Sequence, residues 1–420
     1  MTPDSTAVEA PSMTLLQRAK RWRAFKLPRG QFWFFFVGAV FFNFGFSIFF
    51  LLFNLYLYDL GRTERSLGAI GSFMAVGSIL GTIPVGIIAQ RFGLRVTLTG
   101  GILLAVVFSV LRTCILRQPA QLILAAFTGF ALCTWAVCLS PAVASLTTRR
   151  ERPVAFSLIF ASGIGVGGFG AFIAGRLPGW LRGSRHSPLS STHPVAAALL
   201  FACAVATLAL LPISRLKLRS AAPRAELPRL SNPFLLRFLP AMAVWNLVTG
   251  SFAPFANIYF VHHFGLSLQR VGFVFSVSHL VQFAAVLSAP LLFRRTGLGS
   301  GIMLTQLATA AALVSLASTR TAVPAECVYW IYMGVQYMNE PGIYSLLMDR
   351  IPAGERNGAS ASTFFVNGAS QAIASAAMGA AILRFGYSAA LSVIGALAVV
   401  AAVLFRRLPQ GPLLQAGPSP

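Results

Sequence analysis

Charged residues are scarce in this sequence: they make up 10% of its 420 residues, and only ten of them are aspartate or glutamate. Soluble domains carry roughly 25% charged residues. The chain is 56% hydrophobic, and its mean hydropathy is +0.74. It also lacks the alternation over ~10 residues that marks a membrane β-barrel strand. The composition excludes an ordinary soluble domain and predicts an all-α membrane protein.

Cysteine is also rare. An odd count of five cysteines, without metal-ligand spacing, argues against a disulfide framework or a zinc site. His262 and His263 have no acidic or cysteine neighbour in the sequence, so we predict no metal there. No nucleophile–base pair, paired carboxylates or phosphate-binding loop stands out. The sequence therefore predicts neither an enzyme nor a cofactor.

The formal net charge is nevertheless +23, because 33 lysines and arginines face the ten acids. These basic residues are scattered between apolar runs and form no basic domain, which argues against nucleic-acid binding. Basic residues collect in the cytoplasmic loops of membrane proteins, where they also meet anionic lipids. The charge therefore indicates membrane topology.

Apolar runs of the ~20 residues that a helix needs to cross a bilayer recur along the chain. We expect twelve spans, near residues 32–57, 66–90, 95–116, 119–146, 154–177, 194–213, 233–261, 270–293, 300–319, 327–348, 358–383 and 386–405. With both termini inside, the cytoplasmic segments hold 23 of the 33 basic residues. The positive-inside rule thus predicts cytoplasmic N- and C-termini.

The two halves of the chain repeat. Residue pairs 203 or 204 positions apart recur in order, in the same spans of each half. They are Asn43 and Asn246, Asn54 and Asn257, Tyr56 and Tyr259, Gly61 and Gly265, Gly68 and Gly272, Arg91 and Arg295, and Gly93 and Gly297. A collinear series of this kind indicates parallel repeats of six spans each.

A short basic turn, "GIIAQRFGLR", interrupts the apolar sequence from Gly86 to Arg95. With the twelve spans and the repeat, this turn resembles the signature between helices 2 and 3 of the major facilitator superfamily, roughly Gly-x-x-x-Asp-Arg-x-Gly-Arg-Arg/Lys. The chain is similar to that family over essentially its whole length. Gln90 stands where the family has aspartate, and Leu94 where it has arginine.

The resemblance implies two six-helix bundles, over residues 31–213 and 233–406, joined by a cytoplasmic linker at 214–232. Residues 407–420 would form a cytoplasmic tail. Residues 1–30 are basic, and "MTLLQRAKRWRAFKLP" within them suits either an interfacial helix or a disordered tail. We expect a monomer in contact with membrane lipids, and a bacterial inner membrane as its location.

In the family, the basic turn forms a latch with the start of helix 11. Gly86 would let two helices approach closely, and Gly93 would permit the reversal into helix 3. Uncharged Gln90 would weaken the latch. The alternative is a merely positively charged inner loop. The residues assigned to this conformational gate are Gly86, Gln90, Arg91, Gly93, Arg95, Arg295 and Gly297.

Polar residues inside membrane spans usually face a cavity or the interior of a helix bundle. The resemblance places a substrate cavity between the bundles, and we expect the following residues to line it or to act in coupling: Glu340, His279, Gln282, Asn43, Asn246, Gln336, Tyr337, Asn367 and Gln371. Asn54 and Asn257 are weaker candidates, nearer the outer surface. The alternative for all of them is hydrogen bonding between neighbouring helices.

Glu340 is the acid that falls deepest in a predicted span, where a charge is costly. Pro341 beside it lacks an N–H and bends the helix. We hypothesise that Glu340 carries a coupling proton or meets a cationic substrate, with His279 as its partner. A protonated glutamate with a purely structural role is the alternative.

The resemblance implies a secondary active transporter that moves a small organic solute by alternating access. Glu340 suggests coupling to protons. The sequence leaves the direction of transport open and favours efflux only slightly. A facilitator or uptake symporter of the same fold, or a non-transporting receptor or assembly protein on the same scaffold, stays as the alternative.

Overall fold

The computed structural model describes residue 28 and residues 30–148, 151–183, 194–217, 232–351 and 356–409, and every regular element within them is a helix. The predicted N-terminal interfacial helix, most of the linker and most of the C-terminal tail lie outside these residues. The first half of the chain forms α2 (Phe32–Asp59), α3 (Glu64–Phe92), α4 (Leu94–Cys114), α5 (Gln118–Leu146), α6 (Arg152–Ala174), α7 (Leu177–Gly183), α8 (Pro194–Thr207) and α9 (Leu210–Ser214).

The second half begins with a helical run that changes type around Pro254: α10 (Pro233–Phe252), the 3₁₀ turn η2 (Ala253–Phe255), α11 (Ala256–Ile258) and the π-helical η3 (Tyr259–His263). It continues with α12 (Leu268–Thr296), α13 (Leu298–Ser318), α14 (Ala322–Arg350) and α15 (Arg356–Arg406). A proline inside a helix removes one backbone donor, which accounts for the irregular turns.

Ten helical segments among the described residues are long and apolar enough to cross a membrane. Helices suit this environment because each satisfies its backbone hydrogen bonds internally. One segment lies within α15, which has 51 residues and is broken at Gly386, where φ is 78° and ψ is 172°. The 29-residue α14 is not among the ten; it carries Glu326 and Glu340 within its length.

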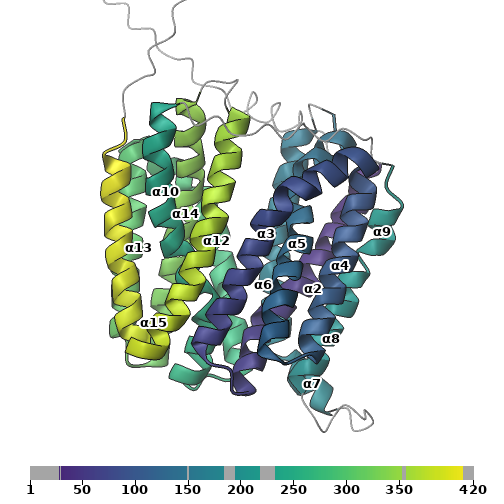
Figure 1. Cartoon of the computed structure of the whole chain (residues 1–420). Helices are drawn as coiled ribbons and strands as arrows, with labels where there is room; N and C mark the ends of the chain where they lie inside the picture. Colours follow the sequence, from purple (N-terminus) through teal and green to yellow (C-terminus); the bar gives the residue numbers. More distant parts are fainter. Residues whose placement is uncertain are drawn as a thin grey trace, which may run out of the picture.

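Two groups of helices stand side by side, α2 to α9 in one and α10 to α15 in the other (Figure 1). They converge at one end and diverge toward the end where α15 finishes, at the top of the view. We call the top the terminal side and the convergent end the far side. The turns at Gly93 and Gly297 lie on the terminal side, and those at Gly61 and Gly265 lie on the far side.

The two groups touch through glycines near the far side. A Cβ added at Gly68 of α3 would collide with the backbone of Ser375 and would lie 3.2 Å from the Cα of Gly379, both in α15. A Cβ at Gly272 of α12 would lie 2.9 Å from the Cα of Gly175, which follows α6. Gly68 and Gly272 are one of the repeated pairs, so the same device joins the groups twice.

Other repeated residues hold matching positions inside each group. The Tyr56 hydroxyl donates to the Thr113 carbonyl at 3.3 Å, and the Tyr259 hydroxyl donates to the Leu316 carbonyl at 3.0 Å. Thr113 and Leu316 are themselves 203 residues apart. The sequence repeat is therefore also a repeat of tertiary contacts.

The glycine contacts predict different effects on stability at two positions of α3. Gly68→Ala should lower the free energy of unfolding by about 1–3 kcal/mol, because the added methyl group overpacks the contact with α15. Gly86→Ala in the same helix should leave the free energy of unfolding unchanged or raise it, because no atom of another described helix lies within 4 Å of a Cβ there. Thermal unfolding of the purified variants measures both. Equal effects at the two positions would contradict the packing described.

Candidate functional site

A cavity of about 510 Å³ lies between the two groups, and both contribute to its wall. Its walls come from α2 to α6 on one side and from α10, η2, α11, α12 and α15 on the other. The polar residues that line it are Ser47, Asn54, Ser78, Arg112, Asn257, His279, Gln371 and Ser375. Ligand sites in proteins have volumes of about 300–1,000 Å³ and combine apolar walls with a few polar groups.

Two asparagines join the groups at the far end of this cavity. Asn54 Nδ2 donates to the Pro254 carbonyl at 2.7 Å, and Asn257 Nδ2 donates to the Leu51 carbonyl at 2.6 Å. The two donors are 203 residues apart, and so are the two acceptors, so the bonds occupy equivalent positions in the two halves and are reciprocal. Asn257 Oδ1 also accepts the Ile258 N–H at 2.9 Å, which supports the irregular turn that follows Pro254.

A third contact between the groups lies at the end of α2. His262 Nε2 is 3.3 Å from Asp59 Oδ1, and the His262 ring lies 4.3 Å from the ring of Tyr58, centroid to centroid. His262 has no acidic neighbour along the chain, but the fold supplies one from the other half. No cluster of three or more metal-ligating side chains occurs in the part of the chain that the structure describes.

His279, Gln371 and Asn367 are predicted site residues that lie at or beside the cavity. His279 Nδ1 donates to the Phe275 carbonyl at 2.8 Å, and Nε2 makes no hydrogen bond with the described residues. A Cβ added at Gly167 would lie 3.1 Å from that nitrogen, so the ring faces α6. Gln371 Nε2 donates to Asn367 Oδ1 at 2.9 Å, and Gln371 lines the cavity.

Other predicted site residues lie elsewhere. Asn246, Gln282 and Gln336 are at most 7% exposed, within the second group of helices, and are not among the residues that line the cavity. Each has one polar side-chain atom that finds no hydrogen-bond partner among the described residues. Asn43 is half-buried and also does not line this cavity. Helical spacing identified polar stripes but could not show which neighbour each stripe faces.

Glu340 lies on a face of α14 with Tyr337 and Tyr344, at the i−3 and i+4 positions. The two tyrosines are 36% and 45% exposed, and Glu340 is half-buried. Among the described residues, no hydrogen bond or ion pair joins Glu340 to His279. The hypothesis that these two act as partners therefore gains no contact from this conformation.

The turn between α3 and α4 is built on Gly93, whose φ of 87° and ψ of 157° few residues other than glycine adopt. Gly297 between α12 and α13 has nearly the same angles, 78° and 158°. The gate residues of these turns that carry charge, Arg91, Arg95 and Arg295, are exposed.

Gly86 and Gln90 lie in the last two turns of α3. Gly86 is not a close contact between helices among the described residues, because a Cβ there would meet none of their atoms within 4 Å. Close packing of α3 instead involves Gly77, where a Cβ would collide with the backbone of Ala126 in α5. Gln90 is exposed.

Arg112 is the cavity residue that sequence reasoning missed. It lies in the last turn of α4, is 2% exposed, and lines the cavity. In the sequence it counted only among the basic residues of the outer side. Its place within the apolar stretch "SVLRTCIL" was the available signal, because ionisable residues in membrane spans are usually functional.

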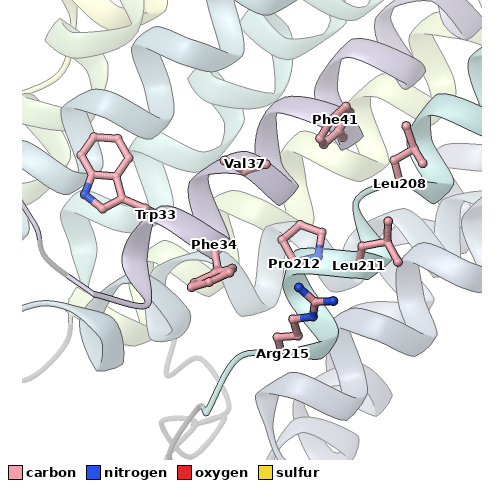
Figure 2. A pocket seen from close by; sticks show the side chains of 8 residues that line it. All are labelled: Trp33, Phe34, Val37, Phe41, Leu208, Leu211, Pro212 and Arg215. Carbon is pink, nitrogen blue, oxygen red and sulfur yellow. The ribbon is translucent and has the colours of Figure 1, made fainter.

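A second hollow, of about 390 Å³, lies on the outside of the first group (Figure 2). It runs between α2 and the segment around α9, and Arg215 lies at one end of it. Its walls are Trp33, Phe34, Val37, Phe41, Leu208, Leu211, Pro212 and Arg215. Nearly all of these side chains are apolar, which suits a surface that faces lipid.

The sequence profile described as Major Facilitator Superfamily matches residues 35–375, which extend from α2 into α15 and include the residues that line the cavity. This chain belongs to the major facilitator superfamily. Membership of this superfamily indicates a membrane transporter rather than an enzyme. No curated protein matches the sequence.

Solved structures of major facilitator transporters share the fold at low identity. The nucleoside transporter NupG has a TM-score of 0.72 at 12% identity, over 90% of this chain and 98% of that one. A bacterial homologue of the human lysosomal transporter Spinster, inward-facing and occupied, has a TM-score of 0.74 at 11% identity, over 89% of this chain and 95% of that one. A D-xylose–proton symporter has a TM-score of 0.71 at 15% identity, over 90% of this chain and 97% of that one.

The asparagine pair gives a prediction about the far side of this major facilitator superfamily member. Asn54→Leu and Asn257→Leu should each lower the free energy of unfolding by about 0.6 kcal/mol, and by no more than about 1.7 kcal/mol, as for hydrogen bonds between membrane helices. Asn43→Leu is the control, because the Asn43 side chain makes no such bond to the other group among the described residues. A double-mutant cycle measures whether the two bonds act as a unit. Losses no larger than for Asn43→Leu would contradict their role.

Proposed function

We propose that this protein is a secondary active transporter that moves a small organic solute by alternating access. The observation that carries the proposal is the cavity between two repeated groups of helices, joined on the far side by reciprocal contacts. Two bundles that rock about a site at their interface expose it to each side in turn. The cavity of about 510 Å³ suits a solute rather than a bare ion.

We infer that the chain crosses the membrane twelve times. Counting α14 as a span, and α15 as two spans that meet at Gly386, adds two to the ten apolar segments. The bundles then comprise residues 31–213 and 233–406. The sequence assigns 23 of the 33 basic residues to the segments joined to helix ends on the terminal side, so we assign that side to the cytoplasm of a bacterial inner membrane.

With this orientation, the conformation described here is inward-facing. The reciprocal asparagine bonds, the Gly68 contact with α15 and the pairing of Asp59 with His262 all lie toward the periplasm. The bundles diverge toward the cytoplasm (Figure 1). The inward-facing structure of the Spinster homologue has a similar fold, which supports this assignment.

We further propose that transport is coupled to protons through Glu340. The carboxyl group lies within α14, next to Pro341, and forms no ion pair among the described residues. Charges in membrane interiors are rare and often mark proton pathways. The similar fold of a D-xylose–proton symporter is consistent with such coupling.

Glu340→Gln should abolish solute accumulation driven by a pH gradient, because the amide cannot take up or release a proton. Exchange of the solute without net proton movement should persist. Proteoliposomes with an imposed pH gradient measure both, with a solute chosen because it raises the unfolding temperature of the purified protein. Glu64→Gln is the matched control, because Glu64 is also half-buried but lies in the first turn of α3, away from α14.

Full gradient-driven accumulation by Glu340→Gln would show that Glu340 is structural. Absence of flux in the wild-type protein, with the solute bound, would instead favour the non-transporting receptor.

The exposed turn that holds Gln90 is where the resemblance to the superfamily places a latch. Among the described residues, nothing lies within 4 Å of a Cβ added at Gly86, so this end of α3 has room to pack more closely. We propose that closure brings Gln90 toward the N-terminus of α15, where partial positive charge favours a carboxylate over an amide by about 0.3–1 kcal/mol.

Gln90→Asp should therefore shift the population about two- to fivefold toward the outward-facing state. A cysteine placed at Ser78 in the cavity, with the native cysteines replaced, should react more slowly with an impermeant thiol reagent on the cytoplasmic side. Gln90→Asn is the uncharged control. An unchanged or faster reaction for Gln90→Asp would contradict the latch.

A further inference from the structure

The guanidinium group of Arg112 is buried in the wall of the cavity without a counter-charge. Its side chain is 2% exposed, and its Nε and Nη1 atoms have no hydrogen-bond partner among the described residues. Its Cζ atom lies 4.2 Å from the centroid of the Phe53 ring. The Gln121 side chain donates to the Arg112 carbonyl at 2.6 Å and so fixes the backbone there, but it does not reach the charge.

A buried cation is costly unless an anion and hydrogen bonds compensate it. The Phe53 ring supplies part of this compensation by a cation–π contact. That contact uses one face of the guanidinium and leaves the Nε and Nη1 donors without a partner among the described residues. The planar fork of donors is the group that best matches carboxylate and phosphate oxygens.

None of the described residues that line the cavity is acidic. The other titratable group there is His279, which is neutral or positive, and the remaining polar groups are hydroxyls and amides. None of the six described acids lines the cavity; among them, Glu326 pairs with Arg270 and Asp59 lies beside His262. The cavity therefore carries positive charge without any negative charge of its own.

The fold itself does not require an arginine at this place. The Tyr56 and Tyr259 hydrogen bonds make Thr113 and Leu316 equivalent positions in the two halves. The residue before Leu316 is Ser315. A scaffold position that takes serine in one half takes a buried arginine in the other, on the wall of the cavity.

We propose that the cavity takes an organic anion, and that Arg112 binds its carboxylate or phosphate group. This inference rests on the proposed transport function and names its substrate class. The anion supplies the counter-charge that the wall lacks, while Gln371 and His279 offer hydrogen bonds to the rest of the molecule. Coupling at Glu340 stays separate, because that carboxyl group does not face the bound anion.

The test is binding to the purified full-length protein at constant ionic strength, followed by thermal unfolding. The probes are acetate and inorganic phosphate, which carry the two groups alone, and glucuronate and glucose 6-phosphate, with glucose as their neutral parent. At least one anion should raise the unfolding temperature of the wild type, and glucose should not. The carboxylate and phosphate probes show which group the site prefers.

Arg112→Gln should weaken that anion's binding at least about tenfold, and Arg112→Lys should weaken it less, since the charge is kept and the fork lost. Arg176→Gln is the matched control, because Arg176 also lies over a phenylalanine ring, that of Phe172 at 3.6 Å, but does not line the cavity. Without ligand, Arg112→Gln should unfold at the same or a higher temperature than the wild type, because an uncompensated charge is removed.

Three results would overturn the proposal. The first is that none of the four anions raises the unfolding temperature, and the second is that Arg112→Gln binds the anion as well as the wild type does. The third is that ligand-free Arg112→Gln unfolds at a lower temperature than Arg176→Gln, because that result would show that Arg112 has a structural role. Loss of transport is a different result: a protein that binds the anion through Arg112 but moves nothing across liposomes would refute the transporter and keep the anion site.

Discussion

Two reciprocal hydrogen bonds join the halves of this protein, from Asn54 to the Pro254 carbonyl and from Asn257 to the Leu51 carbonyl. Lipid provides little hydrophobic driving force between helices, so close packing and polar contacts must hold the bundles together. Glycines beside these bonds bring backbones within van der Waals distance. Since each bond lies at the end of the cavity, the same contacts that join the bundles also close the site. A transporter needs such contacts to be few and reversible, and two hydrogen bonds from asparagine side chains meet that need.

The poverty of charge in the sequence makes each buried charge informative. Glu326 is buried, and Arg270 neutralises it at 2.6 Å, which is the arrangement that a buried acid normally requires. Arg112 and Glu340 form no ion pair among the described residues, and they lie in different bundles. One lines the cavity and the other does not. This separation fits a division of work between binding an anion and moving a proton.

Much of the fold could be predicted from the sequence, because span length and the positions of repeated glycines and tyrosines are local properties. The turns at Gly93 and Gly297 adopt matching angles that the repeat anticipated. The site was harder to predict. Asn246 and Gln336 have the spacing of cavity residues, yet they are buried inside one bundle, because spacing gives the face of a helix and not its neighbour. Arg112 was missed because a basic residue near a span end normally reports topology alone.

Distances between spin labels in liposomes test alternating access most directly. One pair of labels replaces Arg117 and Arg320, equivalent exposed residues on the far side, and the other replaces Phe92 and Thr296, equivalent exposed residues on the terminal side. On addition of the transported solute, alternating access predicts populations in which the far-side distance lengthens as the terminal-side distance shortens. Two distances that stay fixed, or that lengthen together, would contradict it.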